Sequence, residues 1–163
     1  MYEFLPMTDE AAEEIAYQWN YEGEYSFYNM TADQEDLEEF LHPDRSGYYT
    51  VEKDGKMIGY FCFQKKESGT VDIGLGMKPA LTGNGLGLEF ALEGMRFAIA
   101  NYEPLKLSLS VASFNQRAIK VYEKAGFLPI ETFMQDTNGS TYEFLKMEYE
   151  IKENEDVPNA GKF

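Results

Sequence analysis

The sequence predicts an α+β fold: a mixed, twisted, mostly antiparallel sheet of six to seven strands, flanked by about four helices. Two pairs of strand-like runs are joined by turn-forming dipeptides, Asp54-Gly55 and Asn138-Gly139, which is typical of hairpins. Between these pairs the pattern runs strand, helix, strand, helix, which indicates two strands paired in parallel across a crossover helix. A chain of 163 residues, 44% of them hydrophobic, is long enough for one domain with a single core.

The first half of the chain is expected to hold three strands and two helices. The Thr8 hydroxyl can accept a hydrogen bond from the first turn of one helix, and Thr31 with Gln34 fits a capping box for the other. The aromatic segment 21–30 between these helices follows no regular period. The expected ranges are strand 2–5, helix 8–19, helix 31–41, and strands 47–53 and 56–63.

The second half is expected to alternate strands and helices before a closing strand pair. Gly126 suits the position just after a helix, where the backbone turns left-handed. The expected ranges are strand 70–77, helix 86–100, strand 105–111, helix 115–124, and strands 127–135 and 140–150. We expect a single domain over residues 1–151 and a polar, disordered tail over residues 152–163.

The formal net charge of −15 is concentrated at one end of the chain. Residues 1–44 contain thirteen Asp and Glu and no Lys or Arg, and the first basic residue is Arg45. Nucleic acid is therefore not expected as a partner, because phosphate backbones need a basic face. The charge favours a cationic partner. The alternative is that the first two helices simply carry solvated acidic faces.

The residue types also exclude several classes of site. Cys62 is the only cysteine, so the chain has no intramolecular disulfide and no cysteine-based zinc site, and we expect no metal. No basic, apolar leader opens the sequence and no apolar run reaches transmembrane length. We therefore expect a cytoplasmic protein that has no membrane partner.

A glycine-rich stretch, PALTGNGLGLEF at residues 79–90, opens the longest predicted helix. Helix amino termini present unpaired amides to anions, and Gly83, Gly85 and Gly87 leave room for a bulky pyrophosphate. The stretch lacks the Gly-Lys-Ser/Thr ending of a Walker loop. Its G-x-G-x-G spacing and its place after a meander also fit a Rossmann fingerprint poorly.

Two neighbouring patterns agree with an anion site. In the strand DIGLGM, alternation places Asp72, Gly74 and Gly76 on one face, and glycine in a strand often marks the close approach of a ligand. Downstream, Asn115 and Tyr122 lie seven residues apart, hence on one face of a helix. A long, thin ligand with a pyrophosphate at one end suits this layout.

In these residues the chain resembles the GNAT superfamily of N-acetyltransferases. The stretch from Met77 to Gly87 is similar to the acetyl-CoA motif Q/R-x-x-G-x-G/A, and residues 115–127 match N-x-x-A-x-x-x-Y-E-K-x-G-F throughout. The resemblance covers roughly residues 45–150 by element order. One departure is Thr82, where the family usually has Gln or Arg, and we expect altered phosphate contacts there.

The resemblance implies a GNAT fold whose central parallel strands splay apart around acetyl-CoA. It implies that the Tyr122 hydroxyl protonates the thiolate leaving group, whereas the alternative is a tyrosine that only packs the helix on the sheet. The pantetheine arm is expected along strand 70–77 and the pyrophosphate at the glycine loop. The implied acetyl-CoA site comprises Leu75, Gly76, Met77, Thr82, Gly83, Asn84, Gly85, Leu86, Gly87, Leu88, Asn115 and Tyr122.

The general base is less directly indicated. Some family members carry a glutamate five residues before the motif asparagine, and this chain has Ser110 there. Asp72 is the candidate base, with a surface carboxylate as the alternative, and a water relayed through Asp72 or Glu24 is a further option. We interpret His42 as a surface residue and Cys62 as a packing residue.

The resemblance places the acceptor against the first two helices and their connection, which is the acidic stretch of this chain. Glu24, Tyr25 and Tyr28 are the candidate acceptor-binding residues, because aromatic faces beside carboxylates suit an ammonium group. The implied activity is acetyl transfer from acetyl-CoA to a primary amine of a small cationic acceptor, such as a polyamine, an aminoglycoside or an amino-acid derivative. The alternatives are a protein N-terminal or lysine acetyltransferase and a non-catalytic acyl-CoA-binding regulator. The resemblance is also compatible with a homodimer.

Overall fold

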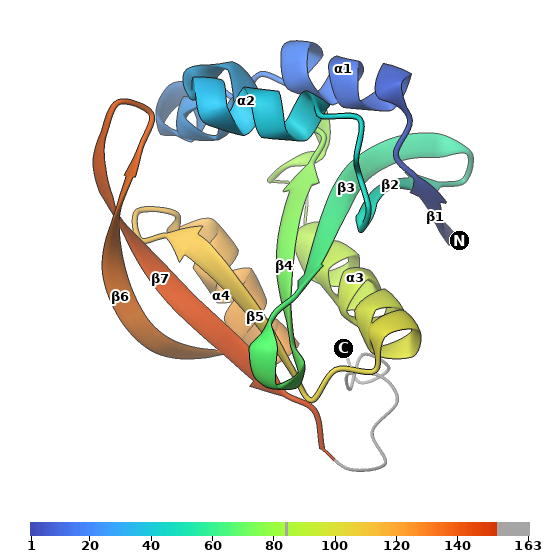
Figure 1. Cartoon of the computed structure of the whole chain (residues 1–163), viewed down its shortest axis with the longest axis vertical. Coiled ribbons are helices and arrows are strands. Elements are labelled where there is room, and N and C mark those ends of the chain that lie inside the picture. Colours follow the sequence, from blue (N-terminus) through green and yellow to red (C-terminus); the bar gives the residue numbers. More distant parts are fainter. Residues whose placement is uncertain (84, 153–163) are drawn as a thin grey trace.

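The computed structural model describes residues 1–83 and 85–152 and shows the predicted α+β architecture (Figure 1). Its seven strands are β1 (Tyr2–Pro6), β2 (Tyr48–Lys53), β3 (Lys56–Lys65), β4 (Thr70–Met77), β5 (Lys106–Ala112), β6 (Leu128–Thr137) and β7 (Ser140–Glu150). The four α-helices of this part are α1 (Asp9–Gln18), α2 (Gln34–Leu41), α3 (Gly87–Tyr102) and α4 (Gln116–Ala125). The predictions that concern Asn84 and the tail beyond Lys152 lie outside the described residues.

The strand order is β1-β2-β3-β4-β5-β7-β6, and β4 with β5 is the parallel pair. Their pairing covers only three residue pairs and ends at Asp72 with Ser108. Beyond that point β4 continues beside β3 as far as Met77, and β5 continues beside β7 as far as Ala112. The two central strands therefore separate, and the sheet opens in a V between them (Figure 1). This confirms the predicted splay.

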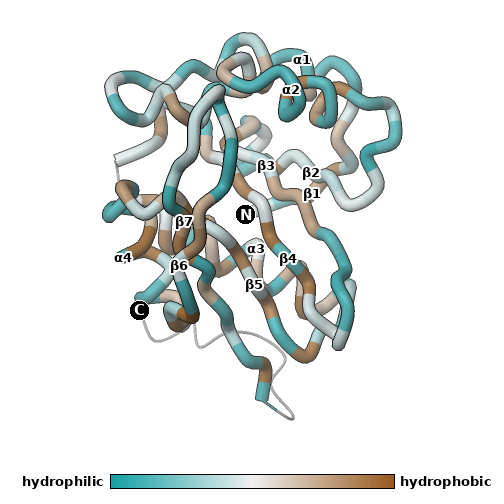
Figure 2. The backbone as a smooth tube through the Cα atoms, turned by 60° about the vertical axis from the view of Figure 1, so that its left-hand side comes forward, coloured by the Kyte–Doolittle hydropathy of each residue, from teal (hydrophilic) through white to brown (hydrophobic). Residues whose placement is uncertain are grey.

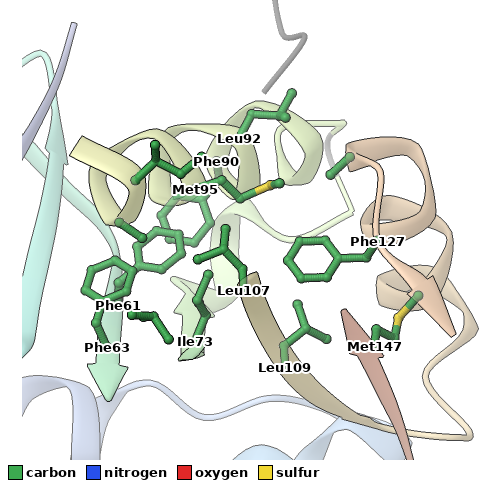
Figure 3. Packing of buried hydrophobic residues seen from close by; sticks show 14 of the residues in the cluster. Phe61, Phe63, Ile73, Phe90, Leu92, Met95, Leu107, Leu109, Phe127 and Met147 are labelled. Carbon is green, nitrogen blue, oxygen red and sulfur yellow. The ribbon is translucent and has the colours of Figure 1, made fainter. Parts of the chain in front are cut away.

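The main core lies between the sheet and the two helices α3 and α4 (Figure 3). The rings of Phe61 and Phe90 stack with their centroids 4.7 Å apart. A Cβ at Gly94 would lie 2.2 Å from the Phe61 ring, so this glycine lets α3 approach β3 closely. Burying each such phenylalanine stabilises the fold by roughly 1.5–3 kcal/mol. This packing fixes α3, which begins directly after the glycine loop, against the sheet.

A second, smaller core holds α1 and α2 over one end of the sheet (Figure 1). Trp19 and Phe40 are buried in it, and Figure 2 shows hydrophilic residues gathered on the outer turns of both helices. The largely buried Arg45 guanidinium donates to the carbonyls of Phe40 and Leu41 and pairs with Asp9. The first basic residue of the chain thereby fastens the acidic helices to each other.

The predicted start of α2 is wrong by two residues. The N-cap is Asp33, whose Oδ1 accepts from the Asp36 amide at 3.1 Å, and not Thr31. Thr31 instead lies inside a short 3₁₀ turn, Met30–Ala32. The extended backbone needed at an N-cap occurs at Asp33 (φ −138°, ψ 120°), so the capping box that the sequence suggested does not form.

The tip of the β6–β7 hairpin reaches the start of α2. The Asp33 carboxylate accepts from the Asn138 amide at 2.8 Å and from the Thr137 hydroxyl at 3.3 Å. Asn138 Nδ2 donates to the Phe27 carbonyl at 2.9 Å. We call these contacts of Phe27, Asp33, Thr137 and Asn138 the hairpin bridge. The bridge joins the last two strands to the segment between α1 and α2.

No helix within residues 1–83 and 85–152 combines the length and the apolar composition that crossing a bilayer would require.

Candidate active site

A cavity of about 820 Å³ occupies the splay between β4 and β5. Its walls come from β3, β4, the glycine loop, α2, α4 and the 3₁₀ segment Gly23–Tyr28. Among the described lining residues four are charged, namely Arg117 and Lys124 of α4 and Asp36 and Glu39 of α2. The cavity therefore carries positive charge on its α4 wall and negative charge on its α2 wall.

The glycine loop has the geometry of an anion site. Gly83 and Gly85 have φ of +77° and +78°, which L side chains rarely adopt, so glycine is required by the turn itself. α3 then begins at Gly87, and its N-cap residue Leu86 makes no side-chain capping hydrogen bond. The Thr82 hydroxyl donates to the Pro79 carbonyl at 2.8 Å, so the residue that departs from the family pattern closes the preceding turn. The start of α3 is therefore placed to present amides to an anion.

Arg117 is a candidate phosphate-binding residue that sequence analysis did not single out. Its guanidinium carbon lies 4.4 Å from the Tyr25 ring centroid. Its Nη1 is 3.4 Å from where a Cβ would stand on Gly83, so the charge sits beside the glycine loop. The signal was its position on the same helix as Asn115 and Tyr122, in the first turn of α4. Tyr25, predicted to bind the acceptor, lines the cavity, and its ring lies against this arginine.

The end of β4 turns backbone groups into the splay. The Lys78 amide donates to the Ile58 carbonyl of β3 at 2.8 Å. By alternation, the backbone groups of Leu75 and Met77 face the other way, toward the gap that β5 has left. The Tyr21 hydroxyl donates to the Met77 carbonyl at 2.7 Å, and burial raises the pKa of Tyr21 to about 12. The backbone groups of Leu75 and the Met77 amide are thus presented to the cavity.

The two glycines of β4 serve different purposes. A Cβ at Gly76 would stand 2.3 Å from the Tyr60 ring, so Gly76 makes room for that ring. A Cβ at Gly74 would meet nothing closer than Cys62 Cβ at 3.7 Å, so Gly74 borders open space. The sequence predicted a groove cleared by both. The structure brings both residues to the cavity wall, with Tyr60 filling the place beside Gly76.

Tyr122 and Tyr60 bring two hydroxyl groups to the cavity from α4 and β3. Burial raises the pKa of both tyrosines, and the nearby Tyr28 raises that of Tyr122 further. Both phenols therefore stay protonated at neutral pH. Neither hydroxyl has a hydrogen-bond partner in the part of the chain that the structure describes. Two proton-bearing donors are thus free to meet a ligand.

Asn115 and Tyr28 are joined to each other. Asn115 Nδ2 donates to the Tyr28 hydroxyl at 3.1 Å, while its Oδ1 caps α4 by accepting from the Ala118 amide at 3.1 Å. Both residues line the cavity. The motif asparagine therefore starts α4 and orients Tyr28 at the same time.

The carboxylates predicted as base and relay lie elsewhere. Asp72 sits in the parallel-paired part of β4, where its Oδ1 accepts from the buried Ser108 hydroxyl at 2.8 Å, and burial raises its pKa. Neither Asp72 nor Glu24 is among the described residues that line the cavity, whereas Ser110 is. Asp36 and Glu39 line it instead. Asp36 and Glu39 lie three residues apart, about one helical turn, and Phe40 is the buried residue of the same helix. This spacing is the sequence signal that would have found the two carboxylates.

His42 is exposed, as its interpretation as a surface residue expects, whereas Cys62, interpreted as a packing residue, is partly buried at the cavity wall. His42 ends α2, and its Nδ1 accepts from the Asp44 amide at 3.1 Å. Cys62 lines the cavity, and burial raises the pKa of its thiol, which keeps it protonated. Within residues 1–83 and 85–152, no three His, Cys, Asp or Glu side chains are grouped so that they could hold a metal ion.

Splayed central strands beside a glycine-rich helix start define the class of protein to which this chain belongs, an α+β acyltransferase domain. The model of the acetyltransferase (GNAT) family matches residues 13–127, and the chain belongs to that family. Solved structures agree on the fold. A spermidine N-acetyltransferase SpeG chimera from Vibrio cholerae superposes with a TM-score of 0.68 at 18% identity, covering 91% of this chain and 95% of that one. A GNAT-family acetyltransferase from Streptococcus pneumoniae gives 0.63 at 18%, covering 93% and 100%.

Curated relatives match a shorter stretch. The mycothiol acetyltransferase of Streptomyces avermitilis is 34% identical over 92 residues, which are 55% of this chain and 29% of that protein. The SPbeta prophage-derived N-acetyltransferase YokL of Bacillus subtilis is 30% identical over 96 residues, which are 56% of this chain and 53% of that protein. The chain thus spans less than a third of the mycothiol enzyme's length.

Proposed function

We propose that this protein transfers an acetyl group from acetyl-CoA to a primary amine of a small cationic acceptor. The observation that carries the proposal is the charged and aromatic cavity in the β4–β5 splay, which runs between the glycine loop and α2. One wall suits a pyrophosphate and the other suits an ammonium group. The splay between them is where a thioester and an amine would meet.

Each part of the acetyl-CoA site has a task in this proposal. The amides of the glycine loop and the start of α3 bind the pyrophosphate, with Arg117 beside them. The backbone groups of Leu75 and the Met77 amide, which face the gap left by β5, pair with the pantetheine arm, and Gly76 lines the cavity between them. Asn115 holds Tyr28 against this arm.

The proposed reaction is a direct attack of the neutral amine on the thioester carbonyl. The carbon–nitrogen bond forms, the carbon–sulfur bond breaks, and the proton lost by the nitrogen ends on the thiol of CoA. Because burial holds the pKa of Tyr122 well above the usual thiol value of about 8.5, this residue acts as a hydrogen-bond donor to the developing thiolate. It stabilises negative charge on sulfur until the proton arrives.

The hairpin bridge favours a small acceptor over a protein. A peptide needs an open groove across the acceptor side, and the contacts of Asn138 with Asp33 and Phe27 tie the tip of the β6–β7 hairpin to the segment between α1 and α2 on that side. The names of two relatives point the same way, since one acts on spermidine and the other on mycothiol, both small molecules.

The test of the proposal is thiol release from acetyl-CoA over a panel of polyamines, aminoglycosides, amino acids and basic peptides. Turnover confined to small cationic amines supports it. Turnover confined to peptides supports a protein acetyltransferase. Calorimetric binding of acetyl-CoA with no turnover on any amine supports the non-catalytic regulator.

The base stays a separate question, for which Asp72 remains our prediction. Replacing Asp72 by Asn should lower kcat/KM mainly at low pH, where less amine is neutral, and the pH–rate profile measures this. Ser108→Ala is the matched control, because it removes the 2.8 Å hydrogen bond and keeps the carboxylate. An equal loss at every pH would assign Asp72 a structural role.

A further inference from the structure

Two carboxylates stand on the α2 wall of the cavity, beside β2 and β3. Asp36 and Glu39 are three residues apart and share a helix face with Phe40. Phe40 packs edge-on against Tyr60 and Tyr48, at centroid distances of 5.3 and 5.9 Å. The acids are therefore fixed above an aromatic wall by a buried anchor on their own helix.

No protein cation neutralises these two carboxylates. Within the described ranges, 1–83 and 85–152, neither Asp36 nor Glu39 forms an ion pair, and their side chains accept no hydrogen bond from another residue. Burial raises the pKa of Asp36, and the charges of Asp33 and Glu39 raise it further. A bound cation would relieve this repulsion.

The surfaces around the pair are those that an alkylammonium chain prefers. Tyr48, Tyr60 and Phe40 present aromatic faces and edges to the cavity, which suits both methylene groups and cationic nitrogen. The Tyr60 hydroxyl has no partner among the described residues. The Tyr60 ring packs against Phe40 of α2, and it lies near Tyr122, whose charged form would raise the pKa of Tyr60. The Tyr60 hydroxyl can therefore accept a hydrogen bond from an amine group of the acceptor.

We propose that Asp36 and Glu39 bind a second ammonium group of the acceptor, so that the acceptor is an extended diamine or polyamine. The inference rests on the proposed function and names the acceptor class for the same cavity. The reacting amine would lie in the splay beside β4, and Asp36 and Glu39 stand on the α2 wall of the same cavity. The chain between the two nitrogens must therefore reach from the splay to the α2 wall.

The test compares α,ω-diaminoalkanes of increasing length with monoamines of the same carbon number, in thiol-release kinetics. The variants are Asp36→Asn and Glu39→Gln. Glu35→Gln and Glu38→Gln are matched controls, because all four carboxylates are exposed on the same helix and only Asp36 and Glu39 are among the described lining residues. Calorimetry gives the Kd for acetyl-CoA in each case.

We expect kcat/KM to peak at one diamine length, because one separation of the two nitrogens fits the fixed distance from the splay to the α2 wall. Each cavity substitution should raise KM for that diamine about 3- to 10-fold. KM for the monoamine and the Kd for acetyl-CoA should not change. Equal effects in Glu35→Gln and Glu38→Gln, equal effects on the monoamine, or the lack of any diamine preference would overturn the inference.

A failure of the proposed function would look different. If the protein binds acetyl-CoA and acetylates none of these amines, the diamines are titrated by calorimetry into its complex with CoA. If the diamines bind and both Asp36→Asn and Glu39→Gln abolish this binding, the cation site is supported and the proposed acetyltransferase function is not. The absence of diamine binding would overturn the site itself.

Discussion

Tyr122 and Arg117 both lie on α4 and line the cavity, yet the sequence marked only Tyr122 as functional. Within residues 1–83 and 85–152, the Tyr122 hydroxyl has no hydrogen-bond partner, and it lies near Tyr28 and Tyr60. Arg117 has its guanidinium between the Tyr25 ring and Gly83. At the scale of single residues, we propose that Tyr122 acts at the acyl group and Arg117 at the phosphates.

Replacing Tyr122 by Phe should lower kcat by about 10²-fold, because one hydrogen-bond donor to the developing thiolate is lost. The Kd for acetyl-CoA, measured by calorimetry, should stay within about twofold, since the ring and its packing against Phe127 remain. Unchanged kcat would leave Tyr122 as a packing residue only.

Replacing Arg117 by Ala should weaken acetyl-CoA binding about 10-fold, because an exposed charged contact to phosphate is lost. The affinity of Arg117→Lys for acetyl-CoA should lie between those of the unchanged protein and Arg117→Ala, since lysine keeps the charge and loses the flat stacking on Tyr25. Lys120→Ala is the control, because Lys120 is an exposed cation of the same helix that is not among the described lining residues. An equal loss of acetyl-CoA affinity in Arg117→Ala and Lys120→Ala would mean that the effect comes from the net charge of α4 and not from a contact of Arg117.

Among the elements, the β6–β7 hairpin contributes Gln135, Thr137, Asn138 and Phe144 to the cavity wall. Its tip is held by one carboxylate, Asp33, which also caps α2. The amides of Asn138 and Asp36 lower the pKa of this carboxyl by donating to it. The ionised form is thus the one that holds the hairpin and the helix together.

Acid should therefore open the hairpin bridge. The folded pKa of Asp33 lies below its usual value near 3.8, so its stabilising effect is present at neutral pH and is lost as the pH falls through the folded pKa. Hydrogen exchange of the Asn138 amide should accelerate there. Asp33→Asn keeps an N-cap residue, and its exchange should be faster at neutral pH with no such step. If the acid-induced change in exchange of the Asn138 amide persists in Asp33→Asn, a group other than Asp33 is responsible for it.

For the whole molecule, the charge distribution sets the response to salt. The acids of residues 1–44 repel one another on α1 and α2, and one guanidinium, that of Arg45, lies between these helices. Tm should rise as the ionic strength is raised to about 0.5 M, since screening shortens the range of this repulsion. In a variant with Glu10, Glu13, Glu35 and Glu38 changed to Gln, the rise should be smaller. A Tm that falls with salt would mean that ion pairs outweigh the repulsion.

The fold was largely predictable because its signals are local. Hairpin dipeptides, alternation and the left-handed Gly126 marked nearly every strand and helix, and Asn138 and Gly139 do adopt the expected positive φ. The start of α2 was missed because two capping patterns, at Thr31 and Asp33, overlap within three residues. Only the bond from Asp33 to the β6–β7 hairpin, more than a hundred residues away, favours one of them.

The sequence by itself determined the family, the glycine loop and the motif from Asn115 to Phe127, because each is a contiguous pattern with a backbone or helix-face requirement. The tertiary structure decided which carboxylates reach the cavity. Asp36 and Glu39 line it, while Asp72 is held by Ser108 in the paired part of β4. That choice depends on where β4 and β5 stop pairing and on how α2 settles over the sheet through Phe40. Both are long-range packing outcomes that no local pattern contains.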